Sequence, residues 1–473
     1  MTILARRIAP APDPADAAAR LAHLPWLMWL DSSADPDHLG RWSYLVADPS
    51  LMVRGEGSRT WLRQRGQSLW TETEGDVLAV LHRLLGERNT PSPAEGPPFI
   101  GGAVGYLAYD WGRVLERRGR ATYDDLGLPD ALFGVYDRVL AWDHAKRECW
   151  LVEEAGQGGQ REAGRGGQDG EVVPSAPLTI PVPFAPSYPV LGLDGAEQIG
   201  LRSTFTHRGY LSAVQRVVEY IRAGDIFQAN LSQRFDAPLS ETPERFYLRL
   251  RTTNPAPFGA YLRCDDVTLL SVSPERFLKL EQGQVETRPI KGTRPRGVGP
   301  LHDAALGREL TESDKDRAEN VMIVDLLRND LSRVCRPGSV RVPALFALEH
   351  HPTVHHLVST VTGQLGAGAT AADLVRASFP GGSITGAPKV RAMQIIAELE
   401  PTERGVYCGS IVWLGRDGAM DSSIAIRTAV AHAGRLYFSA GGGIVADSDP
   451  ELEYRETLDK VQGIVRTLAN GAA

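Results

Sequence analysis

Apolar residues recur with the three- and four-residue spacing of a helix face at several places in the second half of the chain. The first such helix is marked by Tyr210, Val214, Val217, Val218 and Ile221. Gly224 follows it and predicts its end. A second helix is predicted over 316–331, and a third is expected to begin at Gly386-Ala387-Pro388-Lys389, with the proline in its first turn. A last helix is predicted to start at Pro450, capped by Asp449.

Runs rich in β-branched and aromatic residues predict strands between these helices. We expect strands at 267–273, 409–414, 424–431 and 436–439, and two more within 130–152. Helices that alternate with strands in this way indicate an α/β or α+β fold.

The chain divides by composition into three segments. Residues 1–154 mix short apolar runs with turn signals, and residues 190–473 carry the sharper periodicities. Between them, 155–189 is rich in glycine and glutamine and then in proline, which predicts a surface loop or linker, mobile over 156–170.

Composition adds several exclusions. A net charge of −7 over 473 residues argues against a general nucleic-acid binder. No apolar run reaches the ~18 residues of a membrane span, and no secretory signal begins the chain. The four cysteines are far apart and form no CxxC pair, so we expect reduced thiols and a cytoplasmic protein.

Lys291 is the residue that most suggests chemistry. It follows Pro289-Ile290 and precedes Gly292, and it lies sixteen positions after Glu275. Proline and glycine set the backbone so that the amine can be presented to a ligand. A desolvated lysine near other cations becomes a nucleophile, and a glutamate supplies the matching acid or base. The local sequence alone is equally consistent with a solvated lysine at a strand edge.

Carboxylates on two predicted helices indicate a cation site. Glu319 lies on the helix over 316–331, whereas Glu453 and Glu456 are three residues apart on the last helix and share one face. Carboxylates without histidine or cysteine partners suit Mg²⁺. The alternative is a solvated acidic helix face.

Other polar groups leave two interpretations open. Ser383 to Lys389 joins hydroxyls to a helix start, which is typical of an anion site or of simple capping. Arg427, in a predicted strand, would bind a carboxylate or form an ion pair. The glycines at 441–443 follow a predicted strand and either admit a ligand or turn the chain. Of the four histidines at 350, 351, 355 and 356, we expect His356 in the site and the others at the surface.

Six motifs occur in order along the chain. They are SPERF (273–277), PIKGTRPR (289–296), AENVMIVDLLRND (318–330), HLVSTVTG (356–363), GSITGAPKVRAM (382–393), and the stretch from GGGIV (441–445) to EYRET (453–457). Together they resemble the chorismate-utilising enzymes, which include anthranilate, aminodeoxychorismate, isochorismate and salicylate synthases. The resemblance implies the anthranilate synthase component I-like fold, a single large two-sheet sandwich flanked by helices.

The resemblance also implies roles for individual residues. Glu319 and Glu456 match ligands of Mg²⁺, with Glu453 acting through water. The implied substrate-binding positions are Gly292, Thr293, His356, Ser383, Tyr407, Arg427, Gly441, Gly442 and Gly443. In this arrangement Mg²⁺ screens the ring carboxylate of chorismate, and Arg427 holds the pyruvyl carboxylate.

Two positions discriminate between branches of the family. Gln228 stands where members that add water have an activating lysine, which disfavours isochorismate and salicylate synthesis. Lys291 stands where anthranilate synthases have a small residue and aminodeoxychorismate synthases have lysine. The resemblance therefore implies aminodeoxychorismate synthase component I, which aminates chorismate for p-aminobenzoate and folate through a covalent Lys291 intermediate assisted by Glu275. A glutamine amidotransferase subunit would supply the ammonia. Anthranilate synthase component I and a catalytically silent regulatory subunit remain the alternatives.

Ser32, Pro257 and Phe258 match a tryptophan pocket of the amine-transferring members. Bound tryptophan is therefore a further expected ligand, with either a structural or an allosteric role. Asp31 and Gly259 differ from the residues of the feedback-regulated enzymes, so strong feedback inhibition is not expected.

Overall fold

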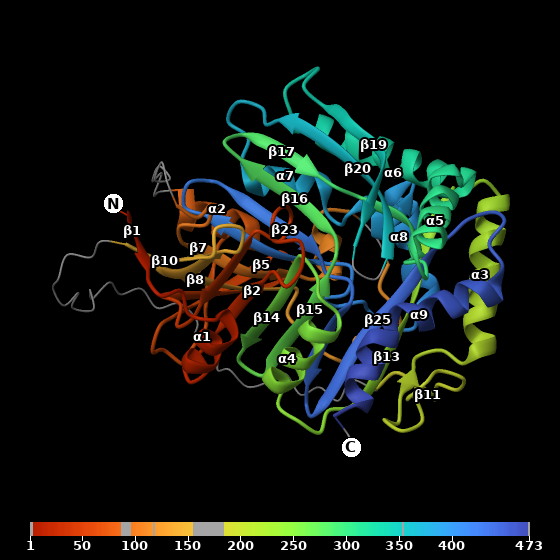
Figure 1. Ribbon diagram of the computed structural model, residues 1–473, viewed down its shortest axis with the longest axis horizontal. Helices are drawn as coiled ribbons and strands as arrows, with labels where there is room; N and C mark the ends of the chain where they lie inside the picture. The colour runs from red at the N-terminus through yellow and green to blue at the C-terminus, as the bar shows by residue number, and fades with distance from the viewer. Residues whose placement is uncertain (1–2, 87–95, 117–118, 155–183, 352–353, 472–473) are drawn as a thin grey trace.

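The computed structural model describes residues 3–86, 96–116, 119–154, 184–351 and 354–471. Within these ranges the strands form two sheets, one of 13 strands and one of 12, and every pairing between named strands is antiparallel. In Figure 1 the first sheet occupies the lower part of the view, with β13, β14, β15 and β25, and the second lies above it, with β16, β17 and β20. The loop predicted for 156–170 lies outside the described residues.

The first sheet combines strands from both ends of the chain. Its order is β1 (Ile3–Ile8), β10 (Glu148–Glu154), β9 (Arg138–Asp143), β3 (Trp42–Val46), β2 (Met28–Asp31), β14 (Phe258–Cys264), β15 (Val267–Ser273), β24 (Thr428–His432), β25 (Arg435–Ile444), β13 (Gln228–Pro238), β12 (Arg202–Ser203) and β11 (Tyr188–Pro189), with β21 (Gly386–Ala387) also paired to β13.

The second sheet also combines strands from distant parts of the chain. Its order is β18 (Ile290–Pro295), β20 (Val354–Gln364), β17 (Gln284–Thr287), β16 (Arg276–Glu281), β23 (Met420–Ile424), β22 (Ser410–Gly415), β7 (Gly102–Leu107), β8 (Ala131–Tyr136), β4 (Leu51–Glu56), β5 (Arg59–Gln64) and β6 (Thr71–Thr73), with β19 (Arg341–His350) also paired to β20.

Helices cover the outer faces of the two sheets. They are α1 (Pro14–Leu21), α2 (Val77–Gly86), α3 (His207–Arg222), α4 (Pro243–Thr253), α5 (Pro300–Glu312), α6 (Asp314–Ser332), α7 (Ala371–Ser378), α8 (Lys389–Leu399) and α9 (Pro450–Ala469), with the 3₁₀ turns η1 (Tyr109–Val114) and η2 (Gly382–Ile384). Among these described helices, none has the length and apolar character needed to cross a membrane. All four cysteines are buried free thiols.

Four apolar cores among the described residues hold these layers together, and one of them joins α3 and α8 to β13. The core between the sheets contains aromatic side chains from both of them, such as Tyr44 from the first sheet and Trp413 from the second, whose ring centroids are 6.1 Å apart. A second core joins α2, α6 and α7 to the second sheet, and a third joins α1, α4 and α9 to the first. Both faces of the central strands are covered, so β7, β8, β15 and β22 are buried along their whole length.

Several predicted elements are confirmed. The helix marked by Tyr210 to Ile221 is α3, and Gly224 has the positive φ of +82° that suits a helix end. The helix predicted over 316–331 is α6, and the strand predicted at 267–273 is β15. The Asp449 side chain accepts a hydrogen bond from the Leu452 amide at 3.0 Å and caps α9 as expected.

Other predictions were wrong at their boundaries. Residues 130–152 contain parts of three strands, because a hairpin turn with Arg147 at φ +56° separates β9 from β10. The strand predicted over 424–431 is interrupted at 425–427, where Arg427 has φ +48° and leaves the extended conformation. The third helix begins at Lys389 with Pro388 as its N-cap residue, because Gly386-Ala387 pairs with β13 instead.

Candidate active site

An open strand edge lies at the end of β25. Strand β24 pairs with β25 only between residues 435 and 438, whereas β13 continues its pairing to Ile444. Among the described residues, 439–444 therefore have a sheet neighbour on one side only. Gly441, Gly442 and Gly443 lie on this stretch, inside the strand and not after it as predicted.

The glycines allow side chains to lie directly against this backbone. A Cβ atom at Gly442 would be 2.8 Å from Glu453 Oε2, and one at Gly443 would be 2.0 Å from Gln228 Nε2. Any larger residue would therefore push away the acidic face of α9 on one side or the Gln228 amide on the other. This explains the glycine run through packing as well as through access for a ligand.

Helix α9 brings Glu453 and Glu456 to this edge. Glu453 Oε1 accepts a hydrogen bond from Ser448 Oγ at 2.6 Å, and Glu456 Oε1 accepts one from Lys460 Nζ at 2.5 Å. Lys460 also donates to the Gly441 carbonyl at 2.8 Å. Burial raises the pKa of Glu453. Burial opposes ionisation of Glu456 too, but the ammonium groups of Lys460 and Lys315 outweigh it and lower its pKa.

Helix α6 supplies Glu319 to the same site. Burial raises the pKa of Glu319, the charges of Lys291 and Lys315 oppose that rise, and the negative charge of Glu456 adds to it. The two carboxylates are therefore close enough to repel each other. A cation between them would relieve this repulsion.

The residues present fit a Mg²⁺ ion that is held by few protein ligands. Within the described ranges, no three acidic, histidine or cysteine side chains surround a common point as a complete metal site would require. Mg²⁺ keeps several waters and is commonly held by one or two carboxylates and a substrate oxygen. Glu319 and Glu456, with Glu453 behind them, are a suitable donor set for such an ion.

Ser383 connects Lys291 with Glu275. Lys291 Nζ donates a hydrogen bond to the Ser383 carbonyl at 3.0 Å, and Ser383 Oγ donates one to Glu275 Oε1 at 2.7 Å. Lys291 lies on β18 at an irregularity in its pairing with β20, beside Gly292 at φ +86°. This local distortion turns the lysine out of the regular ladder toward the turn at η2.

Burial shifts both reactive groups toward neutrality. Glu275 is only 5% exposed, and burial raises its pKa to about 7 against the opposing effects of Ser383 and Lys291. Burial likewise lowers the pKa of Lys291, although the charges of Glu319 and Glu275 oppose this shift. These shifts favour the protonated carboxyl, which can donate a proton, and the uncharged amine, which can act as a nucleophile.

His356, Thr293 and Arg427 form another part of the site. His356 Nδ1 lies 2.9 Å from Thr293 Oγ1. Burial, together with the charge of Arg427, lowers the pKa of His356 to about 3, so its ring is neutral. The half-buried Arg427 guanidinium makes no hydrogen bond or ion pair with any residue that the structure describes, and burial lowers its pKa. An unpaired guanidinium in such a place suits a carboxylate ligand.

Tyr407 is buried beside the same site, with the Arg404 guanidinium 5.8 Å from its ring centroid. Burial raises its pKa well above the usual value, so the phenol stays protonated. Lys389, by contrast, pairs with the buried carboxylate of Asp330 at 2.7 Å. The capping interpretation was wrong, because the N-cap residue Pro388 makes no side-chain hydrogen bond, Ser383 Oγ donates to Glu275, and Thr385 Oγ1 donates to the Gly381 carbonyl at 3.1 Å.

The expectation of three surface histidines was wrong for His355. Its side chain is fully buried, and its Nε2 lies 2.9 Å from Asp303 Oδ1 while its Nδ1 lies 2.8 Å from His350 Nδ1. Strand β20 alternates side chains between two faces, and both faces are covered here, so neighbouring His355 and His356 are both buried.

Sequence reasoning missed two cations and an ion pair near the site. Lys460 is four residues after Glu456, a spacing that predicts a contact on one helix face. Arg404 is likewise four residues after Glu400, and that pair is buried. Lys315 is four residues before Glu319 on α6, so the same spacing signal was present there, whereas its effect on Glu456 links two helices that are far apart in sequence.

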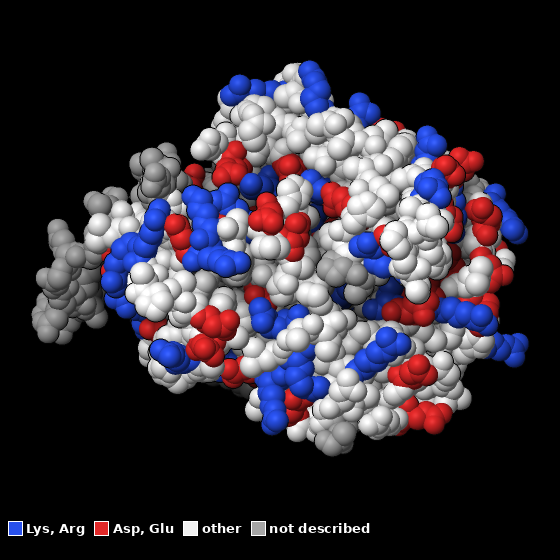
Figure 2. Space-filling view, viewed as in Figure 1, with Lys and Arg blue, Asp and Glu red and all other residues white. Residues whose placement is uncertain are grey.

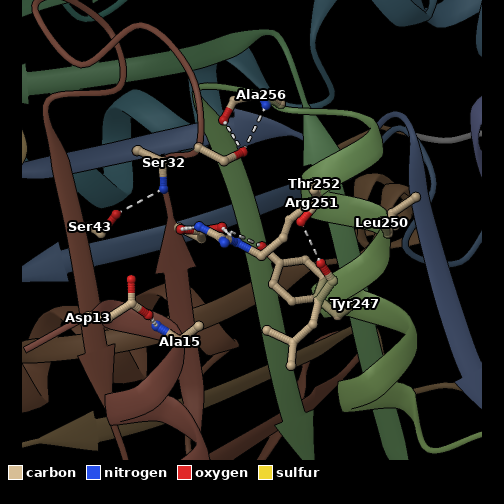
Figure 3. Close-up of polar contacts among 12 residues, drawn as sticks. Asp13, Ala15, Ser32, Ser43, Tyr247, Leu250, Arg251, Thr252 and Ala256 are labelled. Atoms are coloured by element: carbon tan, nitrogen blue, oxygen red, sulfur yellow. Dashed lines mark hydrogen bonds and ion pairs between the residues drawn. The ribbon is translucent and has the colours of Figure 1, made fainter.

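Ser32 directly follows β2 and lies close to the segment that leads into β14, where Ala256 is labelled in Figure 3. Ser32 Oγ lies 2.8 Å from the carbonyl oxygens of both Trp42 and Pro257, and the Ser32 amide donates to Ser43 Oγ at 2.9 Å. Phe258 follows Pro257, and its ring lies 5.2 Å from the Arg276 guanidinium carbon. The structure thus brings Ser32, Pro257 and Phe258 together.

The fold and the comparison with known families define the class of this chain. A family model described as chorismate binding enzyme matches residues 28–466. The chain belongs to the chorismate binding enzyme family. It is 45% identical over 450 residues to aminodeoxychorismate synthase component 1 of Klebsiella aerogenes, which covers 95% of each chain.

Anthranilate synthase components are similar as well. The chain is 43% identical over 372 residues to anthranilate synthase component 1 of Thermus thermophilus, covering 79% of this chain and 78% of that one. The crystal structure of anthranilate synthase component I from Streptococcus pneumoniae matches with a TM-score of 0.74 and 32% identity, covering 90% and 92% of the two chains. The predicted two-sheet sandwich flanked by helices is confirmed by this match.

Proposed function

We propose that this enzyme aminates chorismate at C4, as an aminodeoxychorismate synthase component 1 does, and makes 4-amino-4-deoxychorismate for p-aminobenzoate and folate. The observation that carries the proposal is the hydrogen-bonded set of Lys291, Ser383 and Glu275, in which burial favours a neutral amine beside a protonated carboxyl. The 45% identity to the Klebsiella aerogenes enzyme supports the same assignment.

The first chemical step forms a covalent bond to Lys291. Its neutral amine attacks ring C2, the two ring double bonds shift from C1=C2 and C5=C6 to C1=C6 and C4=C5, and the C4 hydroxyl leaves. Glu275 gives its proton to that hydroxyl, which departs as water, and the lysine nitrogen remains attached as a secondary ammonium. A pKa of about 7 leaves a useful fraction of Glu275 protonated near neutral pH.

The second step replaces the lysine by ammonia. Ammonia attacks C4, both ring double bonds shift back to C5=C6 and C1=C2, and Lys291 leaves C2 as a neutral amine. The new C4 ammonium passes a proton to the Glu275 carboxylate, so that both residues regain their starting states. The sum is chorismate plus ammonia giving 4-amino-4-deoxychorismate plus water.

The remaining polar groups bind and orient the substrate. Arg427 lacks a counter-ion among the described residues and would hold the pyruvyl carboxylate. Gly292, Thr293 and the open edge of β25 offer backbone groups to the ring side. Mg²⁺, when held by Glu319 and Glu456, would neutralise the charge of the ring carboxylate.

Two further ligands belong to this proposal. The relatives' designation as component 1 supports a second component, and we expect a glutamine amidotransferase that delivers ammonia. Tryptophan would bind near Ser32. The polar groups of Ser32 are already hydrogen-bonded, so tryptophan would have to displace a bond or pack on the apolar atoms, which favours a structural role over a regulatory one.

Product identification tests the proposal. The purified protein would be incubated with chorismate, Mg²⁺ and ammonium at alkaline pH, with and without an added aminodeoxychorismate lyase. Formation of p-aminobenzoate only when the lyase is present is the expected result. Fluorescent anthranilate formed without the lyase would assign the chain to the anthranilate synthases, the alternative that the Thermus thermophilus relative supports. No conversion of chorismate at all would indicate a silent subunit.

A further inference from the structure

A buried ion pair lies behind the Lys291 site, in the segment that joins α8 to β22. Arg404 and Glu400 have side chains that are 3% and 5% exposed. Arg404 Nε donates to Glu400 Oε2 at 2.8 Å, and its Nη2 donates to Glu400 Oε1 at 2.6 Å. Glu400 Oε1 also accepts from the amide and the hydroxyl of Ser232, each at 2.8 Å. The carboxylate is therefore fully engaged.

The remaining donors of Arg404 reach two other parts of the chain. Its Nη1 donates to the Ile384 carbonyl at 3.1 Å, and its Nη2 donates to the Asn230 carbonyl at 2.5 Å. Its guanidinium carbon lies 4.6 Å from the ring centroid of Tyr109 and 5.8 Å from that of Tyr407. A lysine ammonium is not planar and lacks the several fixed N–H donors of a guanidinium, so it cannot make all of these contacts.

Ile384 directly follows Ser383, the residue between the two reactive side chains. The Ser383 carbonyl accepts from Lys291, and its hydroxyl donates to Glu275. The next residue, Thr385, is held as well: its carbonyl accepts a hydrogen bond from the backbone N–H of Asn230 at 2.7 Å. Arg404 and Asn230 therefore fix the carbonyls of two successive residues immediately after Ser383.

We propose that Arg404, paired with Glu400, is a positioning residue that fixes Ser383 for its contacts with the two reactive side chains. The inference rests on the proposed function, because that function gives those side chains their chemical roles. Arg404 touches neither of them and would act only through the peptide at 383–385.

The proposal gives a direction for the effect on Lys291. The Ser383 carbonyl favours the charged ammonium, and the Ser383 hydroxyl favours the charged Glu275 carboxylate, which in turn stabilises that ammonium. If Ser383 moves, both effects weaken. The amine of Lys291 should then lose its proton at lower pH.

The test measures the titration of Lys291 without any substrate. Arg404→Lys would be compared with the unaltered protein by labelling with trinitrobenzenesulfonate between about pH 6 and pH 10, with modification of Lys291 quantified by mass spectrometry. Modification of the exposed Lys146 serves as an internal reference. We expect the midpoint for Lys291 to fall by about one pH unit.

Arg234→Lys is the matched control. Arg234 forms a similar buried pair with Asp125, with side chains 10% and 2% exposed, and lies 5.6 Å from the Tyr437 ring centroid, but it makes no contact with 383–385. This variant should label Lys291 as the unaltered protein does. Glu400→Gln is a second test variant and should shift the midpoint in the same direction as Arg404→Lys.

The outcomes separate this inference from the proposed function. A folded Arg404→Lys or Glu400→Gln protein that labels Lys291 like the unaltered protein would overturn the inference, whatever product the enzyme makes. An equal shift in Arg234→Lys would also overturn it. Failure of both test variants to fold, judged by circular dichroism, would reject it too, since the pair would then serve the whole fold. If the chorismate assay gives anthranilate, the proposed function fails, but the labelling experiment still tests whether Arg404 positions Ser383.

Discussion

The Ser32 region and the Lys291 region both carry buried charged groups, but they differ in how fully those charges are paired within the described chain. Near Ser32, the wholly buried Asp31 carboxylate accepts from Arg251 Nε at 2.6 Å and Nη2 at 3.1 Å, and the Tyr247 hydroxyl is 3.3 Å away. Figure 3 shows Arg251 and Tyr247 on α4 facing β2 across this network. Each charge there has its partner within the chain.

The Lys291 region has charged and polar groups that lack a partner among the described residues. Arg427 has no anionic partner in the described parts of the chain, and the buried amide oxygens of Gln228 and Asn230 accept no hydrogen bond there. Glu319 and Glu456 repel each other. In Figure 2, acidic and basic surfaces adjoin in the area between α5 and α9 of Figure 1. Unsatisfied groups destabilise a fold, so their concentration here indicates groups that a ligand completes.

The largest effect should come from removing the nucleophile. Lys291→Ala should lower kcat by at least about 1,000-fold, because the covalent step has no substitute amine. Stability should change little, since the lysine makes one hydrogen bond. Chorismate turnover with ammonium measures the effect, and Lys279→Ala, on β16 and paired with Glu281, is the control. Unchanged turnover in Lys291→Ala would remove the covalent role.

Glu275→Gln should change the pH dependence of the free energy of unfolding. Because the folded protein raises this pKa from 4.5 to about 7, the folded state holds a proton that the unfolded state has lost. The unaltered enzyme therefore loses stability as the pH rises from about 4.5 to about 7. Glutamine cannot ionise, so the variant should gain up to about 3 kcal/mol relative to the unaltered enzyme at pH 8 and little at pH 4.

Urea unfolding at both pH values measures the difference. Glu281→Gln, whose side chain is 46% exposed at the end of β16, is the control and should show no such pH dependence. A gain for Glu275→Gln that is equal at both pH values would contradict burial as the cause.

Substitution in the Ser32 region should lower stability and leave activity nearly unchanged. Asp31→Asn leaves the Arg251 charge without its counter-ion and should lower the free energy of unfolding by about 2 kcal/mol, while kcat with ammonium stays within about twofold. Asp325→Asn, which breaks an exposed pair with Arg328, should cost less than about 0.5 kcal/mol. A large loss of activity in folded Asp31→Asn would break the contrast between the two regions.

The smallest effect concerns the metal. Glu456→Gln should raise the Mg²⁺ concentration needed for half-maximal activity by at least about tenfold, because one hard anionic ligand is lost. Glu451→Gln, on the same helix but paired with His207 and Arg455, is the control. An unchanged Mg²⁺ titration for Glu456→Gln would show that the ligand assignment is wrong.

Local sequence predicted the elements whose signals are local. Helices α3 and α9 have regular apolar faces and end at a glycine or begin at a cap, and strand β15 is a continuous apolar run. The breaks in chain direction were harder to predict. Arg427 is a bulky residue with φ +48°, and no propensity marks such a position because packing around it holds the conformation.

The candidate site was predictable as a set of residues but not as a geometry. The motif resemblance named Lys291, Glu275 and Ser383, yet only the folded chain shows that one serine contacts the other two. His355 was expected at the surface because polarity suggests exposure, whereas its partner Asp303 comes from a different element of the fold. Long-range pairs of this kind leave no spacing signal in a single sequence.

The pairing of strands that are far apart in the sequence has a consequence for the synthesis of the chain. Strand β7 pairs with β22, with Gly102 opposite Gly415, and β2 pairs with β14. During synthesis, one edge of β7 therefore exposes unpaired backbone N–H and C=O groups until more than 300 further residues have left the ribosome. Such distant pairings slow folding and leave the nascent chain prone to aggregation. We expect production of this enzyme to depend on translation speed and chaperone supply more than its finished stability suggests.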